Sequence, residues 1–518
     1  MCGILFARSD QINVSQFAAA LSDIQHRGPD SSGNIVQFGN NFLGHNRLSI
    51  LDLDKRSNQP FFSKDKRFVI IYNGEIYNYR ELIKEYDISV NTTSDTELVL
   101  ELYIKLGPRC LERLNGMFAF VIYNSSTNDV FVARDRLGVK PLYQYKKKGT
   151  MIFSSEISPI LRLIGGSKVD EVGLRQYRKL RTFFNGRTIY SDISMFPAGH
   201  YYERDRLYKY WELPQRTHAP APTDEELHSL IESAIKYRLV SDVPIGSYLS
   251  GGLDSTIVAG LSKTEHTWTI GAESNNEFHY ARLAAKKFNT NHHEILYDNE
   301  KFIGAAEYMI KKRKEPLSVP NEVLLYLMTR EVKTLNTVIL SGEGADELFF
   351  GYDRIFRWAA AISHLSIKEF DALYSYGSTD DIEIVEDAIA PFKSYGRPID
   401  VVAAFFQVAH LHGLLRRLDY STMLCSVEAR VPFVDYRLVE RMAGVDFDYR
   451  MKGGIVKEPL KRIFGYLVPR EVIERKKVGF PVNLSEVLPD TIPGKTQMDK
   501  WFNFNLLTLG IHTGEQSI

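Results

Sequence analysis

The chain has 518 residues, which predicts roughly two to four domains, and its 44% hydrophobic and 25% charged residues are typical of soluble globular proteins. Lys+Arg and Asp+Glu balance at 64 each, so the net charge favours neither nucleic acid nor an anionic membrane as the main partner. We find no apolar run near the roughly 18 residues that a membrane helix needs, and three widely spaced cysteines form neither a disulfide framework nor a zinc pattern, so a cytoplasmic setting is expected.

The first 200 residues are predicted to be rich in strands. Short runs of β-branched and aromatic residues, separated by Gly, Asn and Asp, occur at 68–78, 116–124, 129–135 and 149–156. Residues 94–107 have helical spacing. Strands and helices therefore alternate, with several antiparallel hairpins, which predicts an α+β sandwich.

A change of character follows residue 210. The stretch 212–227 carries three prolines and little apolar content, which is typical of an interdomain linker, and Thr223 is placed to cap a helix. Strand, glycine-rich turn and helix follow at 243–263, a strand at 266–272, a helix at 277–289, and another strand and loop at 336–352. This alternation predicts a doubly wound parallel sheet, with mostly helices at 355–475. We expect domains at 1–210 and 225–485, a linker at 211–224, and a weakly patterned, partly mobile tail at 486–518.

The turn "SGGLDS" (250–255) joins a predicted strand to a predicted helix. Gly251 and Gly252 let the backbone approach a ligand, and the helix N-terminus offers free N–H groups to phosphate oxygens. Ser250 and Ser255 add hydroxyl donors, but the turn is not a Walker A loop. Asp254 would repel phosphate unless a cation lay between them, so it implies Mg²⁺. The alternative is a tight turn with a capping aspartate.

A second loop, "SGEGADE" (341–347), also follows an apolar strand. In a parallel sheet both loops open at the carboxyl edge, where ligands bind. Asp254 and Asp346 are therefore expected to share Mg²⁺ beside a nucleotide, although Glu343, Asp346 and Glu347 could instead form a solvated acidic loop.

Ten motifs in order resemble the glutamine-hydrolysing asparagine synthetases and their relatives. These are MCGI, HRGPD (26–30), RLSI (47–50), NGEIYN (73–78), SDTE (94–97), ARDRLGVKPLY (133–143), the two loops above, SVEARVPFVD (426–435) and KEPLKR (457–462). The resemblance covers roughly residues 1 to 480. It implies a class II glutamine amidotransferase domain with an Ntn-type sandwich, followed by an ATP-pyrophosphatase synthetase domain, with ammonia passing between them.

Within that resemblance, Cys2 is the nucleophile once Met1 is removed. Its free α-amine, with a pKa of about 7.7 to 8.0, can accept the thiol proton. Asn73 and Gly74 resemble the oxyanion hole of the family. The alternatives are a small buried cysteine at position 2 and an ordinary Asn-Gly hairpin turn at 73–74.

The remaining predicted glutamine contacts are charged. Arg47 can bind the α-carboxylate through two parallel hydrogen bonds, and Asp95 and Glu75 can bind the α-ammonium. Arg47 could instead form a surface salt bridge. Asp95 could instead, or in addition, cap the helix that starts in SDTE.

Lys457 is expected to supply positive charge for adenylation, because Pro459 two residues later fits the first turn of a helix and places Lys457 at its N-terminus. A solvated lysine is the alternative. Glu428 and Arg430 are expected to pair, and Asp435 either faces the site or caps a helix. The run 310–314 is predicted to be a solvated basic face. The predicted ATP and pyrophosphate contacts are Ser250, Gly251, Gly252, Asp254, Ser255, Ser341, Gly342 and Glu343, and the predicted metal ligands are Asp254 and Asp346.

Two departures from the family leave the acceptor open. Residues 315–330 read EPLSVPNEVLLYLMTR where housekeeping asparagine synthetases carry another pattern, and Phe350 stands where many relatives have glycine. Aspartate is the default acceptor, and a sugar acid such as a uronate is the rival. A degenerate, non-enzymatic relative is the third hypothesis. Expected partners are glutamine, ATP and a carboxylic acid, with no nucleic acid and, from family habit, a homodimer.

Overall fold

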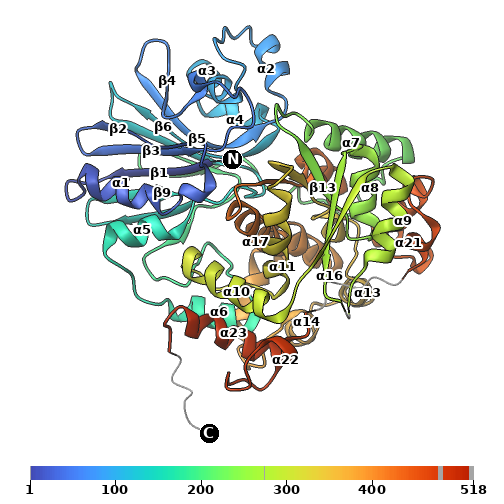
Figure 1. The fold of residues 1–518 in the computed structure, drawn as a ribbon. Helices are drawn as coiled ribbons and strands as arrows, with labels where there is room; N and C mark the ends of the chain where they lie inside the picture. The colour runs from blue at the N-terminus through green and yellow to red at the C-terminus, as the bar shows by residue number, and fades with distance from the viewer. Residues whose placement is uncertain (1, 274, 476–481, 513–518) are drawn as a thin grey trace.

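A computed structural model describes residues 2–273, 275–475 and 482–512, which form an N-terminal two-sheet part beside a larger, mostly helical part (Figure 1). Strand β1 (Cys2–Arg8) shows why the first part is a sandwich. Ile4 and Phe6 point into the core between the sheets, whereas Leu5 and Ala7 belong to the core on the outer face with helix α1 (Val14–Ser22). This period of two buries both faces of the strand.

Both sheets of the sandwich are antiparallel and six-stranded. The first has the order β10 (Ser194–Met195), β8 (Tyr143–Lys147), β9 (Thr150–Ser154), β1 (Cys2–Arg8), β3 (Asn41–Arg47) and β2 (Ser31–Phe38). The second has the order β12 (Arg206–Lys209), β11 (His200–Glu203), β7 (Asp129–Arg134), β6 (Gly116–Asn124), β5 (Phe68–Ile76) and β4 (Phe61–Phe62). The helices of this part are α1, α2 (Tyr79–Glu85), α3 (Asp95–Leu106), α4 (Cys110–Arg113), α5 (Ile157–Ile164) and α6 (Glu171–Leu180). The predicted α+β sandwich, its four predicted strands and its predicted helix are confirmed, whereas β1, β2 and β3 were not identified from the sequence.

The second part is built on a five-stranded parallel sheet with the order β15 (Asn291–Leu296), β14 (His266–Gly271), β13 (Ile245–Tyr248), β16 (Val338–Leu340) and β17 (Glu428–Arg430). The chain starts in the middle at β13, runs outward to β15, and then returns to place β16 on the other side of β13. The strand order therefore reverses between β13 and β16, which is the switch point where ligands bind in doubly wound folds. The predicted parallel sheet is confirmed.

Helices surround this sheet and, as predicted, make up most of 355–475. They are α7 (Asp224–Tyr237), α8 (Leu253–Ser262), α9 (Phe278–Phe288), α10 (Asn299–Arg313), α11 (Asn321–Val332), α12 (Ala345–Leu348), α13 (Asp353–Ala361), α14 (Ile367–Tyr374), α15 (Ile382–Ile389), α16 (Pro398–Phe405), α17 (Leu411–Met423), α18 (Tyr436–Met442), α19 (Phe447–Arg450), α20 (Glu458–Phe464), α21 (Arg470–Glu474), α22 (Leu484–Val487) and α23 (Gln497–Thr508).

One helical stretch is long and apolar enough to cross a membrane by length and composition, a feature that the sequence analysis did not find. It spans Pro398–Met423 and is the one such stretch in the described part of the chain. It consists of α16, a π-helical turn at Phe406–His410 and α17. Of its most apolar window, 72% is buried inside the fold. Its apolar side chains therefore pack in the core, as they do in core helices of soluble proteins.

The predicted linker is ordered along the surface of the helical part. Trp211 donates from Nε1 to Glu440 at 2.6 Å, and the Ala219 N–H donates to the Gly444 carbonyl at 2.8 Å. Leu213 is buried. These contacts dock the segment against α18 and the turn that follows it.

The C-terminal tail, predicted to be weakly patterned and partly mobile, contains a helix at Gln497–Thr508, and residues 513–518 of this tail lie outside the described residues. This helix, α23, lies beside α6 and α10 (Figure 1) and begins with a capping box at Thr496. Trp501, Phe502 and Leu506 are buried. The helical spacing of these apolar side chains gives α23 a buried face.

The prediction of a solvated basic face at 310–314 is wrong for Arg313. Its side chain is 1% exposed, and its Nη1 donates to Glu322 Oε2 at 2.9 Å. Glu315 lies 3.7 Å away, and the guanidinium stacks on the Tyr420 ring at 4.0 Å. The burial is possible because acids from the next segment neutralise the charge.

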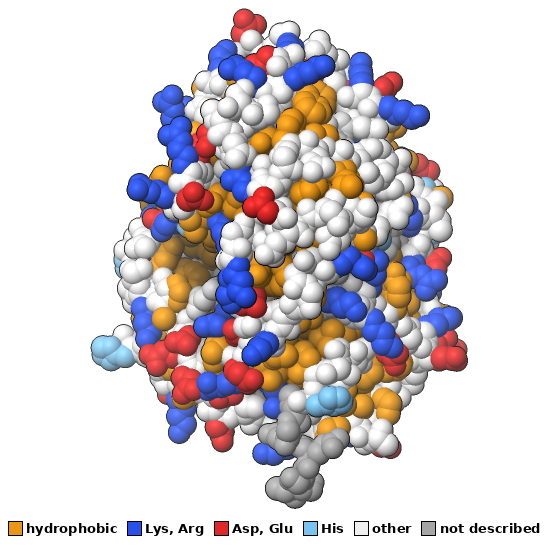
Figure 2. Space-filling view, turned by 90° about the vertical axis from the view of Figure 1, so that its left-hand side faces the viewer, with side chains coloured by type: hydrophobic (Ala, Val, Ile, Leu, Met, Phe, Trp, Pro, Cys, Tyr) orange, Lys and Arg blue, Asp and Glu red, His pale blue; other side chains and the backbone are white. Residues whose placement is uncertain are grey.

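On the outer surface, positive and negative side chains are both spread over the face shown in Figure 2, between apolar patches. This distribution agrees with the equal numbers of acidic and basic residues in the sequence.

Candidate active sites

Cys2 lies at the start of β1, paired with Arg47 at the end of β3. Its side chain is buried, and burial raises the pKa of its thiol above the usual value. The Cys2 N–H donates to Asn73 Oδ1 at 2.9 Å. A buried thiol of this kind needs a base close by before it can act as a nucleophile.

Asn73 and Gly74 lie inside strand β5, opposite Ala119 and Phe118 of β6, so the alternative of a hairpin turn is excluded. Asn73 is fully buried, and its Nδ2 group finds no hydrogen-bond partner among the described residues. A Cβ on Gly74 would come within 2.3 Å of the Met117 carbonyl oxygen. Packing against β6 therefore requires glycine at position 74. The Asn73 side-chain amide next to Cys2 has N–H groups that no acceptor of the described residues uses. Such a buried donor is costly unless a ligand uses it.

Arg47 is held by neutral oxygens. Its Nη1 donates to the Asp54 carbonyl and to Asn58 Oδ1, both at 2.9 Å. Its Nη2 donates to the Leu51 carbonyl at 3.1 Å and to the Asp52 carbonyl. These hydrogen bonds fix the guanidinium plane, and no carboxylate of the described residues pairs with Arg47, so the surface salt bridge considered as its alternative is not found there.

Arg47 also lines a cleft of about 420 Å³ between the two parts of the chain. Asp30, Ser49 and Lys55 line it from the sandwich, and Lys333 lines it from α11's C-terminal end. The cleft is large enough for a small molecule, and Arg47 is part of its lining.

Asp95 is the first residue of α3, and the cap of that helix is Ser94, whose side chain accepts from the Thr96 N–H. Asp95 Oδ2 instead accepts from the Tyr72 hydroxyl at 2.7 Å and from the Ile76 N–H at 2.8 Å. Burial raises the pKa of Asp95 to about 6, because it outweighs these hydrogen bonds. The carboxylate is thus directed toward β5 and not to helix capping.

Glu75 links the sandwich to the helical part. Its Oε2 lies 3.3 Å from Arg430 Nη2, and Arg430 also donates to Glu428 Oε1 at 2.6 Å, as predicted for that pair. Burial raises the pKa of Glu75 well above its usual value. Asp435 accepts from the Arg437 N–H at the start of α18, so of its two alternatives the structure has the helix cap.

The two predicted phosphate loops lie at adjacent strand ends, after β13 and after β16. Gly251 has φ of +70°, a conformation that favours glycine, and Gly252 is the N-cap of α8. A Cβ on Gly342 would lie 3.0 Å from Asp254 Cβ, so the loops touch. Ser250 and Ser255 share a hydroxyl hydrogen bond of 3.1 Å, and the Ser341 N–H donates to the Arg430 carbonyl at 2.9 Å.

Lys457 joins the two loops. It is the N-cap of α20, with Pro459 in the first turn, as the sequence predicted. Its Nζ lies 2.5 Å from Asp254 Oδ2 and 2.6 Å from Asp346 Oδ1. Burial alone would lower the pKa of Lys457, but the two carboxylates outweigh it and raise the pKa above the usual value. The solvated-lysine alternative is excluded.

The predicted metal ligands Asp254 and Asp346 thus converge on one cationic group. Groups of three or more His, Cys, Asp or Glu side chains placed to hold a metal ion do not occur in the residues that the structure describes. A divalent ion here would need ligands beyond protein side chains, such as phosphate oxygens and water, which is the usual coordination of Mg²⁺ at nucleotide sites.

The acidic loop continues into a buried polar cluster that sequence analysis did not identify. Glu343 pairs with Arg417 at 3.0 Å, so it is not in a merely solvated loop. Glu347 accepts from the Tyr352 hydroxyl at 2.6 Å, with His410 of the π-helical turn 3.7 Å away. Burial, together with Asp346, raises the pKa of Glu347 to about 8.

Arg27, from the HRGPD motif, is another residue that the sequence did not assign. It is fully buried, and its Nε donates to the Cys2 carbonyl at 3.2 Å. Its other nitrogens pair with Glu156 at 3.0 Å and with Asp419 of α17 at 2.8 Å. The HRGPD motif was the one feature of the sequence that could have pointed to Arg27. Its pairing with Asp419 could not be predicted, because the two residues lie 392 positions apart in the sequence.

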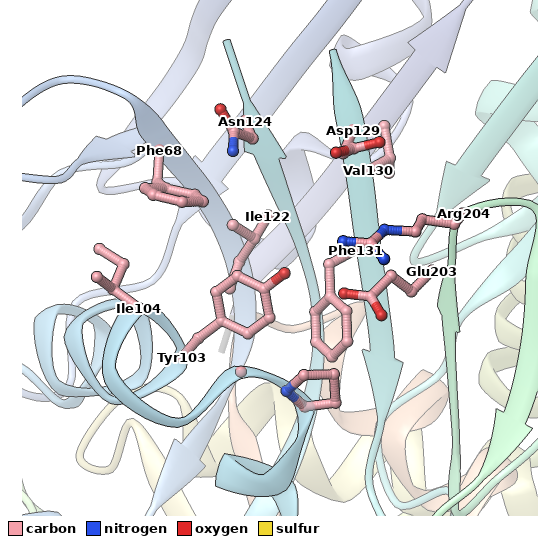
Figure 3. A pocket seen from close by; sticks show the side chains of 12 residues that line it. Phe68, Tyr103, Ile104, Ile122, Asn124, Asp129, Val130, Phe131, Glu203 and Arg204 are labelled. Carbon is pink, nitrogen blue, oxygen red and sulfur yellow. The ribbon is translucent and has the colours of Figure 1, made fainter. Parts of the chain in front are cut away.

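A second pocket, of about 380 Å³, lies between α3 and strands β5, β6 and β7 of the second sheet (Figure 3). Phe68, Tyr103 and Phe131 form its apolar wall, with Asp129 and Glu203 at its rim. It contains none of the predicted site residues.

Known proteins match both parts of the chain. The model of the glutamine amidotransferase domain matches residues 1–211, and the asparagine synthase model matches residues 226–493. The glutamine-hydrolysing asparagine synthetase 3 of Bacillus subtilis is 30% identical over 548 residues, covering 93% of this chain and 87% of the relative. The glutamine-hydrolysing asparagine synthetase B of Escherichia coli is 28% identical over 517 residues, covering 95% of this chain and 83% of the relative.

The two matched regions follow the order of the two centres along the chain, and the relatives align over nearly all of it. The centre at Cys2 lies in the amidotransferase match, and the paired loops lie in the synthase match. The chain therefore belongs to the asparagine synthase family, whose members use ATP as co-substrate, and is a glutamine-dependent amidotransferase of the ligase class.

Proposed function

We propose that the chain hydrolyses glutamine at Cys2 and transfers the ammonia to an adenylated carboxylate, with aspartate as acceptor and asparagine as product. The observation that carries the proposal is the buried Asn73 amide beside Cys2, whose Nδ2 hydrogens are unspent within the described residues. Because the Asn73 Nδ2 group has no acceptor among the described residues, it can donate to the oxyanion that forms only during the reaction.

The first half-reaction uses the terminal nitrogen of Cys2 after removal of Met1. This nitrogen, 2.9 Å from Asn73 Oδ1, becomes an α-amine and takes the thiol proton. The sulfur attacks the side-chain carbonyl carbon of glutamine, the C–N bond breaks, and the proton leaves with ammonia. Water then releases glutamate from the thioester. The Asn73 Nδ2 and the Gly74 N–H stabilise the oxyanion in both steps.

Charged groups around Cys2 would hold the ends of glutamine. Arg47, which pairs with no carboxylate of the described residues, offers its charge to the α-carboxylate. Asp95 of helix α3 and Glu75 of strand β5 offer carboxyl oxygens to the α-ammonium. A substrate held at both ends leaves its amide carbon as the atom free to meet the sulfur.

The second half-reaction would take place at the paired loops. An acceptor carboxylate oxygen attacks the α-phosphorus of ATP, and pyrophosphate leaves. Ammonia then attacks the acyl carbon, and AMP leaves. The Lys457 ammonium would bind phosphate oxygens directly. Backbone N–H groups and hydroxyls of the two loops would bind further phosphate oxygens, and the residues concerned are Ser250, Gly251, Gly252, Ser255, Ser341, Gly342 and Glu343.

Asp254 and Asp346 would hold Mg²⁺ together with phosphate oxygens. Their convergence within 2.6 Å of the Lys457 ammonium marks a place where the protein demands positive charge. The ion supplies further neutralisation of the leaving pyrophosphate when it is bound.

A uronate or another small carboxylate is the second candidate acceptor. The observation that favours it is the unusual segment 315–330, whose carboxylates turn inward: Glu315 accepts from Tyr143, and Glu322 pairs with Arg313. Neither acid is available there to hold the ammonium group of aspartate.

The test is a pyrophosphate-release screen with glutamine and Mg·ATP over aspartate, glucuronate, galacturonate and acid-free controls. Pyrophosphate release that depends on aspartate, with one asparagine formed per pyrophosphate, is the expected result. Release with a uronate alone would replace aspartate as the acceptor. Glutamine hydrolysis without pyrophosphate release for every acid would contradict the ligase assignment of the second centre to small carboxylates.

A further inference from the structure

The segment between Arg47 and Asn58 belongs to the sandwich, yet it docks on the helical part. Leu48 and Ile50 are buried in one apolar cluster with Val338 of β16 and Met423 of α17. The same segment supplies the oxygens that hold Arg47. The support of Arg47 is therefore built on both parts of the chain.

Asp242 makes two hydrogen bonds to this segment from the other side. Its backbone N–H donates to the Ile50 carbonyl at 2.9 Å, and its Oδ2 accepts from the Asp52 N–H at 2.8 Å. The two bonds reach residues two positions apart, so they fix the direction of the segment as well as its position.

Asp52 has a conformation that needs this support. Its φ is +50°, in the left-handed region that residues other than glycine seldom adopt, and its side chain is 3% exposed. Its carbonyl accepts from Arg47 Nη2. Its Oδ2 accepts from the Thr93 N–H at 2.8 Å, two residues before Asp95. Asp52 thus connects the groups proposed for the two ends of glutamine.

The chain leads from Asp242 directly to the phosphate loop. Strand β13 starts three residues later at Ile245, and Asp254 lies twelve residues after Asp242. The Ser241 hydroxyl donates to the Val243 carbonyl at 2.8 Å, which keeps this approach short and ordered. The clamp on Asp52 is therefore anchored to the strand that presents the nucleotide loop.

We propose that Asp242 is a positioning residue through which the synthetase domain sets the affinity of the glutaminase centre for glutamine. It acts on Arg47 through Asp52 and touches neither glutamine nor the reacting atoms. The inference rests on the proposed function, because it takes Arg47 as the group that binds the α-carboxylate.

Loss of the Asp242 carboxylate leaves the Asp52 N–H without its acceptor and removes the restraint on the left-handed backbone. The Asp52 carbonyl then no longer holds Arg47 in place. Cys2 and Asn73 are held by strands β1 and β5, so the chemical step keeps its geometry. The expected signature is a higher KM for glutamine at unchanged kcat.

The experiment measures glutamate formation against glutamine concentration, and pyrophosphate release with ammonia as nitrogen source, using the full-length enzyme. In Asp242→Ala, KM for glutamine is expected to rise about tenfold, as loss of one hydrogen bond to a charged group allows. Asp242→Asn keeps an acceptor oxygen and should restore KM to within about threefold of the wild type. Ser241→Ala alters the same approach without touching Asp52 and serves as the matched control.

An unchanged KM in Asp242→Ala would overturn the inference. So would an equal fall of the glutamine-dependent and ammonia-dependent rates, because that pattern indicates general damage to the fold. The proposed function fails differently: wild-type enzyme would then not hydrolyse glutamine, or Arg47→Lys would leave KM for glutamine unchanged.

Discussion

The two centres are built in contrasting ways. Cys2 and Asn73 project from strands β1 and β5 in the interior of a sandwich. The Asn73 Nδ2 group has no hydrogen-bond acceptor among the described residues. Asp254, Asp346 and Lys457 lie at helix starts at a sheet edge, where the carboxylates and the ammonium compensate one another. Under the proposed function, the first centre has its geometry before substrate binds, whereas the second would exchange its internal ion pairs for phosphate and metal contacts.

This contrast predicts that glutamine hydrolysis at the first centre can be abolished while the second centre keeps its activity. Replacing the proposed nucleophile in Cys2→Ala should lower glutamine-dependent pyrophosphate release by about 10⁴-fold or more. Release supported by ammonia should persist, because the paired loops do not depend on the thiol. The two rates are measured on the same preparation, with Cys425→Ala, which removes a cysteine of the helical part, as the control. Equal losses with both nitrogen sources would contradict the separation of the centres.

The reverse separation is expected for Lys457→Met. Removal of the ammonium leaves Asp254 and Asp346 close together without their shared cation, and removes a positive charge from the proposed phosphate site. Pyrophosphate release should fall by about 10³-fold with either nitrogen source, while glutamine hydrolysis measured alone remains. Lys461→Met, one turn further along α20, is the matched control. A normal rate of pyrophosphate release would remove Lys457 from the adenylation step.

The preformed amide at Asn73 gives the next smaller effect. Asn73→Ala should lower kcat for glutamine hydrolysis by about 10²-fold, the usual result of losing one oxyanion donor, with a small change in KM. Asn124→Ala, at the far end of β6, should leave both constants unchanged. If Asn73→Ala raised KM without lowering kcat, the amide would bind the substrate and not the transition state.

The sequence was most informative where a short motif carries its own geometry. Gly251 and Gly252 follow a strand and precede a helix, and Pro459 lies in the first turn of the helix whose N-cap is Lys457. The places of these residues in the fold could therefore be predicted from a few neighbouring residues of the sequence. Phe350, at a position where the resemblance leads us to expect glycine, has φ of +57°. Its ring stacks on Phe356 at 4.1 Å and packs under the Arg450 guanidinium, contacts that offset the backbone strain.

Contacts between distant segments could not be derived in this way. Arg27 meets Asp419, Glu75 meets Arg430, and Arg313 meets Glu322 only because the helical part folds onto the sandwich or onto itself. Each charged residue looks like a solvated side chain in its own segment. Such charges can be buried only when the fold brings oppositely charged partners to them. The prediction that the run 310–314 is a solvated basic face was therefore wrong for Arg313.

The smallest effect concerns pH, and it distinguishes the ligand-binding groups of the first centre from its chemistry. Burial raises the pKa of Asp95 to about 6, and the ionised carboxylate is the form proposed to hold the glutamine ammonium. Between pH 7 and pH 5 the ionised fraction falls from about nine-tenths to about one-tenth. KM for glutamine should therefore rise about tenfold over this interval in steady-state glutaminase assays. A flat KM would exclude Asp95 as the ammonium-binding group.

Asp95→Asn separates this role from stability. The variant should have a raised KM at pH 7 that no longer changes toward pH 5, because the titrating group is gone. Since the folded-state pKa of Asp95 lies above its usual value, the folded protein binds this proton more tightly, and the contribution of Asp95 to stability falls as pH rises through about 6. Asn cannot ionise, so its thermal midpoint at pH 7 should equal or exceed that of the wild type. A lower midpoint together with a pH-dependent KM would assign Asp95 to the fold, through Tyr72 and Ile76, and not to glutamine.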